Sequence, residues 1–206
     1  MIEALSLKTA HQFGDALASQ ARLRYSVFVR HHSLPHAHYD GMEYDEFDTP
    51  AAVYLVWRDP NSVVRGLMRV VPTSEPYMME KYWPYLCQTR ELPKSQDVWE
   101  VSRVCIDHTY PWRVRQLIMP ALLAAIQEFS SRNGIRAAVG VTRRSLLDHY
   151  LGDGVQWLGE TMEVEGRQEA AFWVPTEHMR PHAHCAKHGL NHRLLSFEPL
   201  DRRSAA

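Results

Sequence analysis

The sequence predicts an α/β fold, a three-layer sandwich in which helices flank a mixed central sheet. Two apolar segments within residues 51–71 have the pattern of a hairpin, and a third β-branched segment follows at 98–107. A long segment with helical periodicity, Trp112 to Asn133, separates that third segment from a buried-type strand at 136–142. The length of 206 residues and the apolar content of 45% fit one core, so we expect residues 1–206 to form a single domain.

The composition argues against several classes of protein. The chain has 23 Lys+Arg and 24 Asp+Glu, so its net charge indicates neither nucleic-acid binding nor membrane binding. We expect no signal peptide, and no apolar run approaches the length of a membrane span. The three cysteines, Cys87, Cys105 and Cys185, lack the spacing of a disulfide or metal site, so we expect a cytoplasmic protein.

The first half of the chain alternates periodic segments with one long irregular stretch. The predicted elements are a strand within residues 1–8, one or two helices from Ala10 to about Arg30, strands at Ala51–Trp57 and Val63–Val71, and a short helix within Tyr77–Leu86. Residues 31–50 show no periodicity and predict a long loop, a kind of segment that is often functional in compact domains.

The second half carries the strongest helical signal. The predicted elements are the helix from Trp112 to Asn133 with Gly134 as its stop, a strand at Arg136–Thr142, a helix at Ser145–Leu151, and strands near 156–158 and 169–174. Pro120 lies inside the long helix and predicts a kink or a broken first turn.

The central strand, Val98 to Asp107, carries polar residues that a purely structural strand would not need. Glu100, Ser102 and Arg103 lie in its middle. Because successive side chains of a strand point to opposite faces, we expect Glu100 and Ser102 to share one face and Arg103 to take the other. A buried charge costs several kcal/mol, by order of magnitude, unless it is paired or bound to a ligand. The strand therefore indicates a functional site.

Further charged residues upstream are candidate partners of this strand. Asp45 and Asp48 precede a predicted strand, Arg69 lies inside another, and Arg24 lies on the first helix. Taken singly, Arg24 fits a solvated helix face, and the acidic pair fits a helix cap or a turn. Our hypothesis is that these charges converge on one small, highly charged substrate.

Histidines gather in two places, and neither has the ligand spacing of a common metal site. The first group is His31, His32, His36 and His38. The second is in the tail from about residue 178, with His178, His182, His184, His188 and His192. We predict no metal site, and we expect the tail to be loosely ordered because its apolar content falls.

The order of predicted elements resembles that of the N-acetyltransferase superfamily. In that superfamily, the turn after the central strand usually carries a Gly-rich motif whose backbone N–H groups hold the pyrophosphate of coenzyme A. The equivalent turn here is His108-Thr109-Tyr110-Pro111-Trp112-Arg113, which contains no glycine. The resemblance implies an N-acetyltransferase-like fold, while the missing motif disfavours an ordinary acetyl-CoA transferase.

Over roughly residues 1–175 the chain also resembles the acyl-homoserine lactone synthases, the bacterial autoinducer synthases. The likeness rests on Arg24 with Phe28, Asp45 with Asp48, Gly66-Leu67-Met68-Arg69, Pro72-Thr73 and Glu100-Val101-Ser102-Arg103, in this order. One position departs from the family, which usually has a Trp about where this chain has Leu34. That change affects the shape of the pocket, and Tyr39 and Tyr44 are candidates to compensate.

The resemblance implies a two-step reaction. The amine of S-adenosylmethionine attacks an acyl thioester, carried by acyl carrier protein or by coenzyme A, and forms an amide. Its carboxylate then displaces the sulfonium leaving group, which closes a lactone and releases methylthioadenosine. S-adenosylmethionine is a consumed substrate here, and no cofactor is implied.

The resemblance also assigns roles to residues. The implied catalytic set is Glu100, Arg24, Asp45, Asp48, Arg69 and Arg103, and the implied S-adenosylmethionine site adds Phe28 and Ser102. Glu100 is the expected general base, with the alternative that it only orients an arginine. Asp45 and Asp48 are expected to neutralise the positive groups of the substrate, and an arginine is expected to bind its carboxylate.

Acyl selection is expected further along the chain. The predicted acyl pocket consists of Met78, Met79, Trp83, Leu123, Val139, Val141 and Thr142. A basic group, Arg132, Arg136, Arg143 and Arg144, could meet an acidic carrier protein or could be a solvated face.

The sequence leaves two other functions open. One is an N-acyltransferase of the same fold that uses acyl-CoA and a different amine. The other is a module that binds a nucleoside-like ligand without catalysis, although binding alone would not require Glu100 together with both acids and three arginines.

Overall fold

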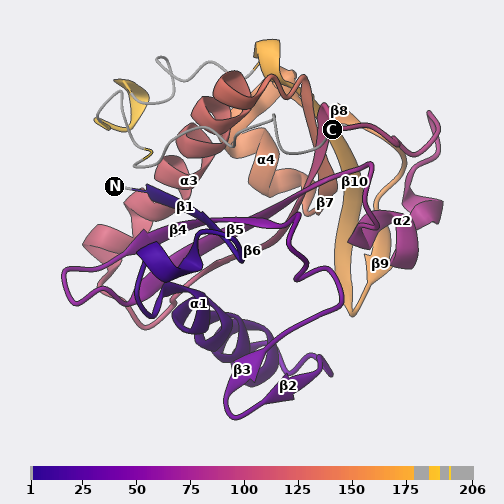
Figure 1. The fold of residues 1–206 in the computed structure, drawn as a ribbon. Coiled ribbons are helices and arrows are strands. Elements are labelled where there is room, and N and C mark those ends of the chain that lie inside the picture. The colour runs from indigo at the N-terminus through magenta and orange to yellow at the C-terminus, as the bar shows by residue number, and fades with distance from the viewer. Residues whose placement is uncertain (1, 179–185, 191–194, 196–206) are drawn as a thin grey trace.

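The computed structural model describes residues 2–178, 186–190 and 195, and it is built around one mixed sheet (Figure 1). The strand order is β1-β4-β5-β6-β7-β10-β8, and β9 pairs with β10. The strands are β1 (Ile2–Ser6), β4 (Val53–Arg58), β5 (Val64–Pro72), β6 (Val98–Ile106), β7 (Ala137–Thr142), β8 (Gln156–Trp157), β9 (Met162–Val164) and β10 (Arg167–Pro175). Strands β6 and β7 pair in parallel, and the other pairs of strands named here are antiparallel.

Helices cover both faces of the sheet, which confirms the predicted three-layer α/β fold. Helix α3 (Trp112–Asn133) packs on one face, where Ile118, Leu122 and Phe129 meet apolar residues of β1, β4 and β5. Helix α1 (Ala16–Arg24) packs on the other face, where Leu23 joins apolar residues of β4 and β5 (Figure 1). Two shorter helices, α2 (Met78–Tyr82) and α4 (Arg144–Leu151), border the end of the sheet near β7 and β10.

The predicted helices differ from the structure in three details. The segment from Ala10 to Arg30 divides into a 3₁₀ turn (Ala10–Gln12), α1 and a π-helical turn (Tyr25–His31). The loop over residues 31–50 contains a small hairpin, β2 (His38–Tyr39) with β3 (Met42–Glu43). Helix α3 continues through Pro120 and does not break there. Among the described residues, no helix is both long enough and apolar enough to cross a bilayer.

The tail histidines fall largely beyond the described residues. His182, His184 and His192, with Cys185, lie outside the part of the chain that the structure describes. His178 and His188 lie inside it. The expectation of a loosely ordered tail therefore stays an expectation.

Two local features of β6 position the site. Pairing between β6 and β7 covers Val98–Val101 against Ala137–Gly140 and ends there, so the two strands part beyond Val101. In the pairing of β6 with β5, Arg103 and Val104 together oppose the single residue Met68, which is a β-bulge. Arg103 adopts a φ of 51° at this bulge.

The bulge makes the prediction for Arg103 wrong. Because it inserts one extra residue, Arg103 lies on the same face of the sheet as Ser102 and α1, where its guanidinium covers the Phe28 ring at 5.4 Å. Alternation resumes at Val104, which packs against the apolar cluster on the α3 face. Strand periodicity alone cannot reveal this reversal.

Candidate active site

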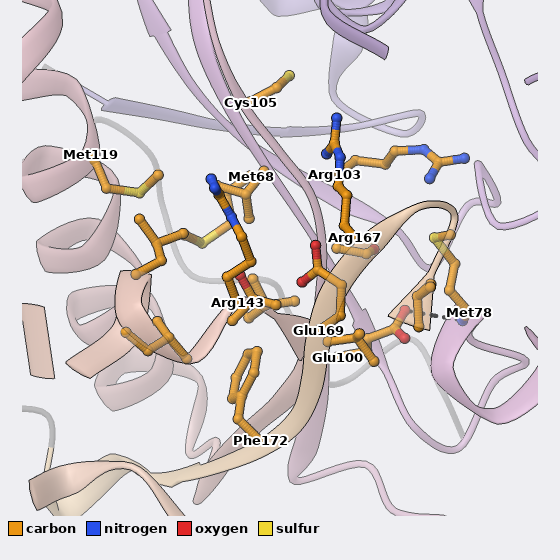
Figure 2. Close-up of a pocket in the computed structure, with 18 of the residues that line it drawn as sticks. Met68, Met78, Glu100, Arg103, Cys105, Met119, Arg143, Arg167, Glu169 and Phe172 are labelled. Atoms are coloured by element: carbon orange, nitrogen blue, oxygen red, sulfur yellow. Dashed lines mark hydrogen bonds between the residues drawn. The ribbon is translucent and has the colours of Figure 1, made fainter. Parts of the chain in front are cut away.

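A cavity of about 400 Å³ lies where β6 and β7 part (Figure 2). Its wall includes residues from both faces of the sheet: Phe28 and Met78 from the α1 and α2 side, and Met119, Leu123 and Ile126 from α3. Glu100, Ser102 and Arg103 line the cavity from β6. The cavity thus connects a polar wall on one side of the sheet with an apolar wall on the other.

Beside this cavity, three arginines and three carboxylates form a charge-balanced network. Arg24 contacts Asp48 at 2.7 Å and Asp45 at 3.4 Å, and its Nε donates to Glu43. Arg69 pairs with Asp45 and lies 2.9 Å from Asp48. Tyr54 donates its hydroxyl to Asp48 at 2.7 Å. These contacts compensate the charge of two fully buried guanidinium groups.

Arg103 joins the same network from the cavity wall. Its Nη2 atom lies 2.9 Å from Glu43 and 2.8 Å from Asp45. The neighbouring Ser102 hydroxyl accepts a hydrogen bond from Arg69 Nε at 3.1 Å. The cavity-facing arginine is therefore held by acids that also hold the two buried arginines.

The pKa values of the network follow from this pairing. Burial alone would raise the pKa of Asp48, but hydrogen bonds and charges from Arg24 and Arg69 lower it to about 2. Burial likewise opposes ionisation of Glu43, but His36, Arg24 and Arg103 lower its pKa to about 2. Burial by itself would lower the pKa of Arg24. The contacts with Asp48 and Glu43 raise this pKa by more, so the net change is an increase. All of these groups stay charged at neutral pH.

Sequence reasoning missed Glu43, which is fully buried and contacts both Arg24 and Arg103. The signal was present in the same loop, because Glu43 precedes Asp45 by two residues on a short strand. Two such residues point to the same side of an extended chain. The acidic cluster therefore includes Glu43 in addition to Asp45 and Asp48.

Glu100 is the cavity carboxyl best suited to proton transfer. Its two oxygens accept backbone N–H bonds, one from Met78 at 3.1 Å (Figure 2) and one from Met79 at 2.6 Å. Burial raises its pKa to about 7, against the opposing effect of these hydrogen bonds. A carboxyl with a pKa near neutrality exchanges a proton readily at physiological pH.

The structure separates the residues expected around S-adenosylmethionine into two sets. Phe28, Ser102, Arg103 and Glu100 line the cavity. Arg24, Asp45, Asp48 and Arg69 are not among its described lining residues, and they form the network beside Arg103. The two aspartates expected to neutralise the substrate are thus already paired with arginines.

The residues expected around the acyl chain also separate. Met78, Trp83, Leu123, Val141 and Thr142 line the cavity. Met79 and Val139 instead lie in a core cluster with Tyr77, Leu86 and Val98, outside the described cavity wall. Leu34 lines the cavity, whereas Tyr39 and Tyr44 are exposed and do not, so the expected tyrosine compensation is wrong.

The four arginines of the basic group have different surroundings in the structure. Arg132 pairs with Glu128, and Arg136 pairs with Asp97 at 2.8 Å. Arg144 donates to Thr161 at 3.0 Å. Arg143 lines the cavity. Arg143 is therefore the member of this group that the structure places at the site.

Known proteins resemble this chain over most of its length. A family model described as autoinducer synthase matches residues 12–177. An isovaleryl-homoserine lactone synthase of Bradyrhizobium diazoefficiens is 35% identical over 136 residues, which are 66% of this chain and 60% of that relative. An acyl-homoserine-lactone synthase of Ralstonia nicotianae is 30% identical over 171 residues, which are 76% of this chain and 80% of that relative.

Solved structures agree with these matches. BjaI, described as a CoA-dependent acyl-homoserine lactone synthase with SAM and isopentyl-CoA, has a TM-score of 0.86 at 28% identity and covers 97% of this chain and 94% of its own. A putative N-acetyltransferase of Lactobacillus plantarum has a TM-score of 0.55 at 18% identity, covers 85% of this chain and 99% of its own, and shares the fold alone. This chain therefore belongs to the autoinducer synthase family, the acyl-homoserine lactone synthases.

Proposed function

We propose that the protein transfers an acyl group from acyl-CoA to the amine of S-adenosylmethionine and then closes the homoserine lactone. The observation that carries the proposal is Glu100, a buried carboxyl with a pKa of about 7 on the cavity wall beside Ser102 and Arg103. S-adenosylmethionine must lose a proton from its ammonium before it can attack a carbonyl carbon. Glu100 is the group on this wall with the chemistry to accept that proton.

In the first step, Glu100 takes one proton from the substrate ammonium. The free amine then attacks the thioester carbonyl, and the tetrahedral intermediate collapses to an amide as the carbon–sulfur bond of the thioester breaks. The leaving thiolate takes up a proton. The Met78 and Met79 amides keep the Glu100 carboxyl in one orientation throughout, because each binds one of its oxygens.

In the second step, a carboxylate oxygen of the same substrate attacks the carbon that bears the sulfonium. The carbon–sulfur bond breaks, its electron pair stays on sulfur, and methylthioadenosine leaves as a neutral thioether. This step is intramolecular, so the main contribution of the protein is to hold the methionyl chain folded. Arg103 and Ser102 line the cavity, and in this proposal they contact the substrate carboxylate.

Arg24, Asp45, Asp48 and Arg69 act in this scheme as positioning residues. Asp45 contacts all three arginines, and Asp48 contacts Arg24 and Arg69. Removing one of these groups would leave an unmatched charge next to Arg103 and would change its orientation. Their effect on turnover is therefore exerted through Arg103.

Two observations support acyl-CoA as the donor and an apolar acyl chain. The chain is 28% identical to BjaI, whose solved complex is described as containing isopentyl-CoA. On the α3 side the cavity is lined by Met119, Leu123 and Ile126, which suit a hydrocarbon group. Acyl carrier protein remains the competing donor in the test.

The test is incubation of the purified protein with S-adenosylmethionine and a panel of acyl-CoA thioesters, matched by the same acyl groups on acyl carrier protein. We expect methylthioadenosine and an acyl-homoserine lactone from at least one acyl-CoA, detected by mass spectrometry. Turnover only with acyl carrier protein would overturn the choice of donor. Acylation of another amine without S-adenosylmethionine would instead support the N-acyltransferase alternative.

A further inference from the structure

Three charged residues of the cavity wall have no part in the network around Arg103. Arg143 lies at the start of α4, and Arg167 and Glu169 lie on β10. Figure 2 shows Glu169 directed into the cavity between the side chains of Arg143 and Arg167. Glu169 is partly buried, and both arginines act on it electrostatically.

Glu169 differs from the other carboxylates of the site because it has no polar partner among the residues that the structure describes. Within the described part of the chain, its oxygens take part in no hydrogen bond and no ion pair. Glu100 is bound by two backbone amides, and Glu165 pairs with His36 at 3.8 Å. Asp45 and Glu43 are held by arginines. Glu169 is therefore a cavity carboxylate whose two oxygens are free to accept donors from a ligand.

Glu169 lies on the same face of the sheet as Glu100, because Glu100 pairs with Val139 and Val139 pairs with Trp173, four residues from Glu169. Strand β10 pairs with β7 with Ala171 opposite Val141, and Val141 lines the cavity. Glu169 is two residues from Ala171, so the two share a face, and Ala171 and Trp173 pack in the same cluster as Met79. The amides of α2 that bind Glu100 belong to this side of the sheet as well.

We propose that Glu169 binds the ribose of S-adenosylmethionine by accepting hydrogen bonds from its two neighbouring hydroxyl groups. This inference rests on the proposed function, because it assumes that S-adenosylmethionine occupies the cavity. A carboxylate with two open oxygens matches a vicinal diol, which offers two donors side by side. The adenosine would then extend from Glu169, and the methionyl end would reach Glu100.

The surrounding charges favour hydroxyl groups over the sulfonium as the partner of Glu169. Arg143 and Arg167 both lie close enough to act on this carboxylate, so a sulfonium held there would meet two positive charges. A neutral diol adds no charge and gains two charge-assisted hydrogen bonds. Coenzyme A cannot make this contact, because its ribose carries a phosphate on one of the two oxygens.

The test is calorimetric binding of methylthioadenosine, which carries the diol but no sulfonium, together with its 2′-deoxy and 3′-deoxy analogues. We expect the parent protein to bind each deoxy analogue about tenfold more weakly. We expect Glu169→Gln to bind methylthioadenosine about tenfold more weakly and to lose most of its discrimination against the deoxy analogues. Glu163→Gln is the matched control, since Glu163 is exposed on β9 outside the described cavity wall.

Each outcome of this experiment either supports the ribose contact or contradicts it. If Glu169→Gln keeps the full discrimination of the parent protein, the ribose contact is wrong. If the substitution weakens S-adenosylmethionine but leaves methylthioadenosine unchanged, Glu169 meets the sulfonium and the proposal is overturned. If the parent protein binds neither compound, the proposed function fails together with the inference. Binding of the deoxy analogues to the unaltered protein can be measured whether or not a variant folds. If the unaltered protein binds both deoxy analogues as tightly as methylthioadenosine, the proposal is also wrong.

Discussion

Arg103 and Glu43, sixty positions apart in the chain, form an ion pair of 2.9 Å that links the cavity wall to the buried charge network. Glu43 also accepts a bond from Arg24, and Arg103 also contacts Asp45 at 2.8 Å. The Phe28 ring supports the guanidinium at 5.4 Å. Arg103 is thus fixed before any ligand arrives, which lowers the cost of ordering it during the reaction.

We expect Glu100→Gln to slow acylation by about 10²–10⁴-fold, because a general base contributes a factor of that order. Glutamine keeps the shape of the side chain, and its one oxygen can accept from either the Met78 or the Met79 amide, so binding of methylthioadenosine should fall much less than the acylation rate. Single-turnover acylation and calorimetry on the same preparation measure the two effects. Acylation within twofold of the parent rate would show that Glu100 is not the base.

We expect the acylation rate of the parent protein to rise with pH through about 7 and then level off. The base must be deprotonated to act, and burial raises the pKa of Glu100 to about 7. The same shift makes ionisation of Glu100 unfavourable in the folded state, since the pKa lies above its ordinary value of 4.5. A pH–rate profile under single-turnover conditions measures this. A flat profile from pH 6 to 8 would contradict the assignment.

We expect Asp48→Asn to lower the free energy of unfolding by about 3–5 kcal/mol, because the buried network would then hold three arginines and only two carboxylates, which leaves one positive charge uncompensated. Asp48 holds both Arg24 and Arg69, at 2.7 and 2.9 Å. Urea denaturation followed by circular dichroism gives the difference. The matched control is Asp15→Asn, which removes an exposed partner of Arg22 and should leave stability unchanged. Equal stability of the two variants would show that the network contributes little.

His36 bridges two segments over the cavity, and its contribution to the stability of the fold should depend on pH. It lies 3.8 Å from Glu165 and 3.5 Å from Glu43, and these partners raise its pKa above the ordinary value of 6.5. A raised histidine pKa gives stability that is complete below about 6.5 and is lost as the pH rises through the raised value. We therefore expect His36→Asn to destabilise the protein more at pH 6 than at pH 9, measured by urea denaturation at both values. A destabilisation that does not depend on pH would contradict the bridge.

Gly140 holds the point where β6 and β7 part, and we expect Gly140→Ala to be destabilising. An added Cβ would lie 2.5 Å from the Val101 carbonyl oxygen and 2.9 Å from the Phe172 ring. The strands would have to separate, at a cost of about 1–3 kcal/mol, and the adjacent cavity would change shape. Thermal unfolding and methylthioadenosine binding measure both effects. Gly154→Ala is the control, because its nearest contact would be 3.4 Å, and it should behave like the parent.

The sequence by itself determined the elements of this protein and most of the residues near its site. Strand alternation and helical periodicity are local properties, so they located β4, β5, β6, β7 and α3 within a few residues. The presence of Glu100, Ser102 and Arg103 in a strand was itself a signal, because charge in a buried strand is costly without a partner. The family resemblance, which the family match confirms, grouped these residues with Arg24, Asp45, Asp48 and Arg69.

Only the tertiary structure decided which of these residues face the cavity. A single bulge turned Arg103 to the face opposite the one that periodicity predicts. Packing placed Glu43 between two arginines from distant segments, and it left Glu169 on the cavity wall without a partner among the described residues. The reason is physical: a side chain's direction and its counter-charge depend on strand register and on contacts between distant parts of the chain, and local sequence patterns do not encode either.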